Sequence, residues 1–228
     1  MAEREEEQKK ISELREKCVK QTIALLGEGG LKFKMIDLAN ALGVSKKTLY
    51  RAFDSKEELL LAVAENCFWE IKCSERRILE DAKLPLLEKI KNLIIVLPEQ
   101  YRSLNWYLVE EVAARYPAVY GYIRKRMESD WDPTLDLLAL GVQQGVLREF
   151  DKTVFKSMVE GCMEHFITSN ELGKQGIGYL QALEKMIDIL LHGIVGMTEE
   201  RTAEERTAEE RTAVTGRKMG RENNNHEI

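Results

Sequence analysis

Basic side chains gather in one short stretch of an otherwise acidic chain. Residues 32–56 contain six lysines and arginines against two aspartates, whereas the whole chain of 228 residues has a net charge of −5. Lys46 and Lys47 would lie in the first turn of one helix and Lys56 in that of the next, where a cation costs about 0.3–1 kcal/mol against the helix dipole. A phosphate docked on these helix N-termini would reverse the sign of that cost. The stretch therefore favours binding of a polyanion, although a solvated surface with chance lysines would have the same charges.

The residues before Lys46 predict a short helix and a sharp turn. Four apolar residues recur at i, i+3, i+4 and i+7 and give one apolar face on a period of 3.6 residues, namely Met35, Leu38, Ala39 and Leu42. Gly43 follows, and glycine adopts the left-handed backbone conformation without steric cost. The chain is therefore expected to reverse direction at Gly43.

A second and a third helix should follow this turn. The hydroxyl of Ser45 is placed to cap the second helix, whose buried side would contain Leu49 and Phe53. Ser55 and Glu58 have the spacing of a capping box, which predicts that Glu58 accepts a hydrogen bond from the amide of the cap residue. Two short helices, a glycine turn and a third capped helix are the layout of a helix-turn-helix unit that binds DNA. The side chains left pointing away from the buried side are Lys46, Lys47, Tyr50 and Arg51.

At this point the chain resembles the N-terminal domain of the TetR (tetracycline-repressor-like) family of bacterial transcription regulators. The resemblance covers roughly the first 60 residues and lies in Asp37-Leu-Ala, Gly43-Val-Ser, Thr48-Leu-Tyr-Arg-Ala-Phe53 and Ser55-Lys-Glu-Glu-Leu59. It implies that residues 44–53 form the recognition helix, with Thr48 and Tyr50 near DNA and Lys56 on a phosphate. The chain departs from the family at Lys47, commonly Gly, at Ala52, commonly His or Tyr, and at Phe33-Lys34, commonly Thr or Ser. The expected DNA-binding residues are Lys34, Ser45, Lys46, Lys47, Thr48, Tyr50, Arg51 and Lys56.

The rest of the chain also predicts helices. Apolar spacing indicates helices over 11–26, from Ser55 to about 81, over 86–97, over 101–112, from Pro117, and from a cap at Asp132 to Gly145. No region alternates with period two, so the expected fold is all-α. The expected division is a helix-turn-helix DNA-binding domain at 1–56, a helical effector-binding and dimerisation domain at 57–197, and a polar tail at 198–228. The helix from Ser55 would connect the first two domains.

Two amphipathic helices close the predicted fold. Their apolar stripes contain Phe155, Met158, Val159, Cys162, Met163 and Phe166 in the first and Leu180, Leu183, Ile187, Leu190, Leu191 and Ile194 in the second. In the family, the last two helices of each subunit pair with those of a second subunit. A homodimer is also expected on functional grounds. Each subunit of a dimer can bind one of two half-sites about 34–36 Å apart, and the two linked contacts raise the affinity for DNA. The alternative is that both helices only complete the core of the monomer.

The resemblance further implies an effector pocket between about residues 60 and 172. This region is rich in aromatic side chains, which line pockets and also fill cores. Four residues are favoured as effector contacts: Trp106, Tyr107, Trp131 and His165.

Other functional classes find less support. The three histidines have no HExxH spacing, and no GxSxG or phosphate-binding glycine loop occurs, so no catalytic residue is assigned. The four cysteines form no CxxC pair and are expected as buried free thiols, without metal or cofactor. The longest aliphatic run has five residues, against about 20 for a membrane span. With a charged N-terminus, this predicts a cytoplasmic protein that does not enter a membrane.

The expected function is therefore that of a DNA-binding transcriptional regulator. It would be a repressor that binds a near-palindromic, double-stranded operator and is released by a small-molecule effector. The first alternative is a DNA-binding structural or interaction protein without an effector, and the second is a helical ligand-binding or enzymatic protein with a vestigial helix-turn-helix. The tail repeats Glu-Glu-Arg-Thr-Ala three times from Glu199. A five-residue period aligns no helix face, so the tail is assigned no binding role.

Overall fold

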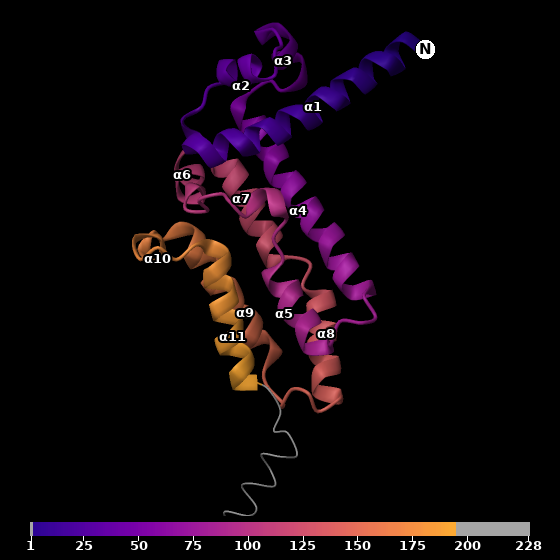
Figure 1. Cartoon of the computed structure of the whole chain (residues 1–228), viewed down its shortest axis with the longest axis vertical. Helices are drawn as coiled ribbons and strands as arrows, with labels where there is room; N and C mark the ends of the chain where they lie inside the picture. The colour runs from indigo at the N-terminus through magenta and orange to yellow at the C-terminus, as the bar shows by residue number, and fades with distance from the viewer. Residues whose placement is uncertain (1, 195–228) are drawn as a thin grey trace, which may run out of the picture.

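The computed structural model describes residues 2–194 of the chain, and these residues form helices and no strand. The all-α prediction is confirmed, and Figure 1 shows the helix-turn-helix unit, α1–α3, at one end of an elongated helical body. The helices are α1 Ala2–Gly29, η1 Gly30–Lys32, α2 Met35–Ala41, α3 Lys46–Ala52, α4 Lys56–Glu80, α5 Leu86–Ile95, η2 Glu99–Tyr101, α6 Leu108–Arg115, α7 Pro117–Glu128, α8 Asp132–Gln143, α9 Lys152–Thr168, α10 Glu171–Lys174 and α11 Tyr179–Ile194.

The helix-turn-helix forms as its local pattern predicts. Leu38 and Leu49 are completely buried between α1, α2 and α3, and Phe53 is 1% exposed. Gly43 has a φ of +64°, which is the left-handed conformation expected for the turn. The hydroxyl of Ser45 accepts a hydrogen bond from the amide of Thr48 at 3.0 Å and so caps α3.

The first helix is longer than its apolar pattern predicts. The expected range was 11–26, but α1 runs from Ala2 to Gly29 and continues through Gly27. Its added first turns are rich in charged residues and largely exposed, with an ion pair of the i,i+4 kind between Lys10 and Glu6 at 2.8 Å. Apolar spacing alone does not detect such a solvated extension, which Figure 1 shows projecting past α3.

The cap of α4 differs from the predicted capping box. Ser55 accepts a hydrogen bond from the amide of Glu58 at 3.1 Å, as expected. The Glu58 carboxylate, however, accepts from the amide of Asp54 at 2.7 Å, one residue before the cap, and from Arg15 at 2.8 Å. Burial by itself would raise the pKa of Glu58, but the hydrogen bonds from Arg15 and Asp54 lower it overall.

The long helix α4 runs from the helix-turn-helix unit down the body of the molecule (Figure 1). One buried apolar cluster joins α1–α4 to Leu97, Tyr101, Val112 and Val119, and a second joins α5, α8, α9 and α11. The expected path of the connector from Ser55 to about 81 is therefore confirmed.

The continuous helix predicted over 101–112 is wrong. Tyr101 ends the short helix η2, a turn follows, and α6 begins only at Leu108. The carbonyl of Tyr101 accepts the indole N–H of Trp106 at 3.1 Å, and the side-chain oxygen of Asn105 accepts the amide of Tyr107 at 3.2 Å. These hydrogen bonds between side chains and the backbone compete with the backbone hydrogen bonds of a helix, so the segment between η2 and α6 stays a turn.

Two further predictions need correction in their details. Asp132 is the first residue of α8 rather than its cap, since Trp131 occupies the cap position without a side-chain hydrogen bond. Of the four cysteines, Cys18 and Cys67 are buried as expected, but Cys73 and Cys162 are only half-buried. All four are free thiols, as predicted.

The last helices fill the core of this chain with part of their apolar stripes. Leu183 and Ile187 of α11 are 2% and 0% exposed and lie in the second cluster with residues of α5 and α9. On α9, Phe155 and Val159 are buried, whereas Met158 is 49% exposed. The repeat-containing tail, 198–228, lies outside the described residues. Among residues 2–194, no helix combines the length and apolar character that a membrane span requires.

Candidate nucleic-acid interface and internal cavity

The outer face of α3 presents polar and basic side chains to solvent. Lys46 and Lys47 are exposed in its first turn, and Tyr50 is 38% exposed one turn further on. The ammonium of Lys46 lies 5.6 Å from the centre of the Tyr50 ring. The hydroxyl of Thr48 is 2.8 Å from that of Ser45, which fixes both side chains beside the helix N-terminus. The geometry offers backbone amides, hydroxyls and lysines to one anionic surface.

Arg51 and Lys34 lie at the edges of this face and already have partners. Arg51 forms an ion pair with Glu7 of α1 in which both side chains are largely exposed. The amide of Lys34 donates to the carboxylate of Asp37 at 2.7 Å, so the Asp37 carboxylate caps the start of α2. The Lys34 side chain remains exposed.

Lys56 connects α4 to the segment between α1 and α2. Its ammonium donates to the carbonyls of Leu31 at 2.7 Å and Phe33 at 2.5 Å, and it lies 3.9 Å from the centre of the Phe33 ring. Burial lowers the pKa of Lys56, and nearby Arg115 lowers it further. An ammonium has three donors, so these carbonyls occupy two of them and leave one for a phosphate.

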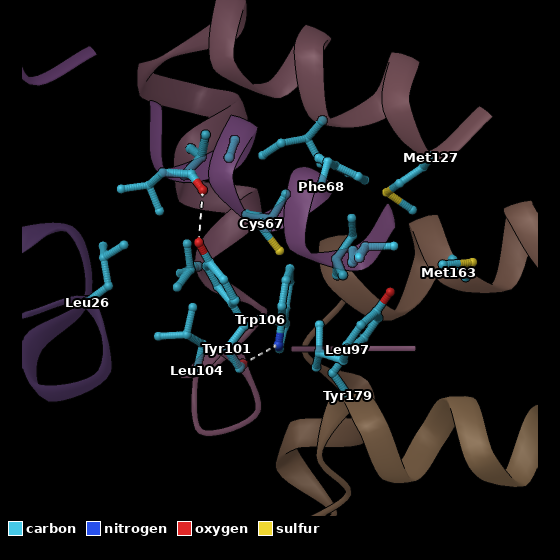
Figure 2. A pocket seen from close by; sticks show the side chains of 18 of the residues that line it. Leu26, Cys67, Phe68, Leu97, Tyr101, Leu104, Trp106, Met127, Met163 and Tyr179 are labelled. Carbon is cyan, nitrogen blue, oxygen red and sulfur yellow. Dashed lines mark hydrogen bonds between the residues drawn. The ribbon is translucent and has the colours of Figure 1, made fainter. Parts of the chain in front are cut away.

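An internal cavity of about 110 Å³, which is partly open to solvent, lies beneath the helix-turn-helix unit (Figure 2). Residues of α4, α6, α7, α9 and α11 meet there, together with Leu26 of α1. Apart from tyrosine, tryptophan and cysteine, every side chain in the wall is purely apolar or a methionine. The lining residues are Leu26, Leu60, Val63, Ala64, Cys67, Phe68, Ile71, Val96, Leu97, Tyr101, Leu104, Trp106, Leu108, Val109, Val112, Val119, Ile123, Met127, Met163, Ile167, Tyr179 and Leu183.

Two polar side-chain groups of the cavity wall form hydrogen bonds within the protein. The Tyr101 hydroxyl lies 3.1 Å from the carbonyl of Val63 and 2.9 Å from the side-chain oxygen of Asn66. The indole N–H of Trp106 donates to the Tyr101 carbonyl, as Figure 2 shows. Burial raises the pKa of the Cys67 thiol to about 12, so this sulfur stays protonated at neutral pH.

Only one of the four residues expected to contact an effector lines this cavity. Trp106 does, because the turn after η2 directs its ring inward. Tyr107 borders open clefts outside, Trp131 packs against the second cluster and donates to the Met127 carbonyl at 3.2 Å, and His165 is 57% exposed beside Glu171. The structure therefore does not bring the four together.

Tyr101 is one of the aromatic residues of the region expected to enclose a pocket, whereas no sequence pattern singled out Met127, Met163 or Tyr179 as lining residues. Residues that fill a packed core and residues that line a cavity show the same apolar spacing along a helix. No pattern in the sequence distinguishes the two.

Comparison with known proteins connects this arrangement to one family. Residues 19–63 match the family described as bacterial regulatory proteins, tetR family. The HTH-type transcriptional regulator YvaF of Bacillus subtilis (strain 168) is 32% identical over 179 residues, which are 78% of this chain and 94% of YvaF.

Solved structures share the fold at lower identity. The ketosteroid transcriptional regulator KstR2 of Mycobacterium tuberculosis is 19% identical with a TM-score of 0.52, covering 80% of this chain and 95% of that chain. FadR from Bacillus subtilis, solved in complex with stearoyl-CoA, is 20% identical with a TM-score of 0.51, covering 78% and 98%. The match of residues 19–63 to the tetR family and the match of most of the chain to YvaF agree with the helix-turn-helix and its exposed basic helix: the chain belongs to the TetR family and is a DNA-binding transcriptional regulator.

Proposed function

We propose that this regulator is a repressor that binds a near-palindromic operator as a homodimer and is released when a small molecule occupies the internal cavity. The observation that carries the release is the position of the cavity wall. Leu26 belongs to α1 of the DNA-binding unit, and Leu60 lies one turn inside α4. A molecule that displaces these walls would change how the DNA-binding unit sits on the body.

DNA binding is assigned to the α3 face and its neighbours. Lys46, Lys47 and Tyr50 are exposed on the helix that the family places in the major groove, and Arg51 lies at its end. The full proposed set is Lys34, Ser45, Lys46, Lys47, Thr48, Tyr50, Arg51 and Lys56. Arg51 would exchange Glu7 for a phosphate on binding, and Lys56 would use its remaining donor.

Dimerisation is assigned to the outward faces of α9 and α11. Val154 and Met158 on α9 and Ile189 on α11 are 55%, 49% and 72% exposed in the single chain. Exposed apolar side chains on two adjacent helices support an interface. The α9 and α11 helices also pack against each other, which supports an interface that both helices share.

Two relatives support an effector by analogy. FadR was solved with stearoyl-CoA, and KstR2 is described as a ketosteroid regulator. The apolar cavity of this chain offers a place for such a ligand.

Selection of bound fragments from the source genome, followed by footprinting, tests the DNA-binding part. We expect a two-fold symmetric footprint with half-sites about one helical turn apart. Failure to retain any fragment at low salt would favour the ligand-binding or enzymatic alternative. Compounds that raise the melting temperature of the free protein are then added to the operator complex. Release by at least one supports an effector, whereas retention against all of them favours the DNA-binding structural protein.

A further inference from the structure

Tyr179 offers the cavity a hydroxyl that the protein itself does not use. Tyr179 begins α11, and its ring lies against Trp106 with 5.0 Å between the ring centres. Figure 2 shows its oxygen directed from α11 into the space that the other side chains border. The Tyr101 hydroxyl and the Trp106 N–H are held by bonds within residues 2–194, whereas no such bond is found there for the Tyr179 hydroxyl, whose residue is only half-buried. A hydroxyl directed into an apolar cavity is available to form a hydrogen bond with a molecule bound there.

The cavity wall contains no charged side chain. All twenty-two lining residues are apolar, aromatic or cysteine. Burial raises the pKa of the Tyr179 hydroxyl, so it is neutral under ordinary conditions. A carboxylate or ammonium placed here would lose its hydration without gaining an ion pair. The chemistry of the wall therefore selects uncharged molecules.

The volume limits the size of the occupant. The cavity measures about 110 Å³. An engineered apolar cavity of about 150 Å³ in another protein stays dry and binds benzene. The present cavity suits a molecule near the size of a single aromatic ring, and the charged groups of an acyl-CoA find no partner in its wall.

We propose that the effector of this regulator is a small, uncharged, mainly apolar molecule with one hydrogen-bonding oxygen, which the hydroxyl of Tyr179 binds. The inference rests on the proposed function in one respect, namely that the molecule in the cavity acts as an effector. Trp106 stacks beside the same ring and forms the adjoining wall. Tyr179 is thus the specificity-determining residue, and the surrounding apolar wall supplies most of the affinity.

Calorimetric titration of the full chain without DNA tests this assignment. The probes are acetophenone, ethylbenzene, which lacks the oxygen, and benzoate, which is charged. We expect acetophenone to bind more tightly than ethylbenzene and benzoate not to bind. Tyr179→Phe should lower the affinity for acetophenone by about 2- to 12-fold, which corresponds to the loss of one hydrogen bond, and should leave the affinity for ethylbenzene unchanged.

Two control variants complete the experiment. Tyr107→Phe removes a hydroxyl outside the cavity and should leave all affinities unchanged. Ala64→Leu adds three carbons to the cavity wall and should abolish binding of both neutral probes. Thermal melting of each variant verifies that it folds.

Several results would overturn the proposal. They are benzoate binding as tightly as acetophenone, an unchanged preference for acetophenone in Tyr179→Phe, or no binding of either neutral probe to the wild-type chain. The titration contains no DNA, so its result stands even if the protein fails to bind an operator. A chain that binds acetophenone and still retains its operator would contradict the proposed release but support the ligand class of the cavity.

Discussion

Lys46 is the exposed lysine at the N-terminus of α3 that we expect to neutralise one phosphate in each half-site. Lys46→Ala should therefore weaken binding to all DNA sequences alike. The slope of log K against log salt should fall by about 0.9 per half-site because one counterion fewer is released. Anisotropy titrations over a range of salt concentrations measure this slope. Lys125→Ala, which removes an exposed lysine of α7, is the matched control, and an unchanged slope for Lys46→Ala would place Lys46 outside the interface.

Lys47 stands where the family commonly has glycine, and its exposed side chain is placed to reach base edges. Lys47→Gly should change which operator sequences are preferred. A lost bidentate base contact would reduce discrimination by about 1–3 kcal/mol. Selection of binding sites with both proteins gives the measurement. Lys47→Ala serves as control for the lower helix propensity of glycine. Identical selected sites in all three proteins would mean that Lys47 contacts only backbone or solvent.

At the scale of elements, α8 approaches its following turn at a glycine. A Cβ added at Gly141 would lie 2.8 Å from Cδ1 and 3.0 Å from Cγ of Leu147, which is 2% exposed. The amide of Leu147 also donates to the Gly141 carbonyl at 3.0 Å, so the turn has little freedom to retreat. Overpacking costs about 1–3 kcal/mol, against a helix-propensity gain of about 0.5–1 kcal/mol. Gly141→Ala is therefore expected to lower the free energy of unfolding in urea.

The matched control for this helix contact is Gly121 of α7. A Cβ at Gly121 would meet no atom within 4 Å. Gly121→Ala should raise the free energy of unfolding by about 0.5–1 kcal/mol because only the propensity change remains. If both substitutions stabilise the protein equally, the close approach at Gly141 does not constrain the packing of α8.

At the scale of the whole molecule, the dimer interface depends on which apolar side chains the single chain leaves exposed. Met158 and Ile189 are 49% and 72% exposed, whereas Leu183 is buried in the chain's own core. Met158→Glu and Ile189→Glu should keep their helicity yet sediment as monomers, and operator affinity should drop steeply because one half-site binds alone. Leu183→Glu should instead unfold the chain, because it buries an unpaired charge.

Leu140→Glu on α8 is the control for the dimer, since Leu140 is a 37% exposed apolar residue outside α9 and α11. It should leave both sedimentation and operator binding unchanged. Dimers that persist in both the Met158 and Ile189 variants would move the subunit interface to another surface.

Features that depend on neighbours a few positions apart were predictable from the sequence. The face of α2, the left-handed turn at Gly43 and the Ser45 cap all arise from hydrogen bonds and packing within one or two helical turns. The same local pattern supports the family resemblance, which the tetR family match over residues 19–63 and the similarity to YvaF confirm. The sequence by itself therefore determined the all-helical class, the DNA-binding unit and the family.

Features that depend on distant residues were decided only by the tertiary structure. Arg15, 43 positions away, completes the hydrogen bonds of Glu58. The helix expected over 101–112 breaks because Trp106 bonds back to Tyr101 and points into the cavity. Tyr179 reaches that cavity from the last described helix. Spacing along one helix shows that a side chain faces inward but not what lies opposite it, so only the packing of α1, α4, α6, α7, α9 and α11 distinguishes a filled core from a cavity that can hold a ligand.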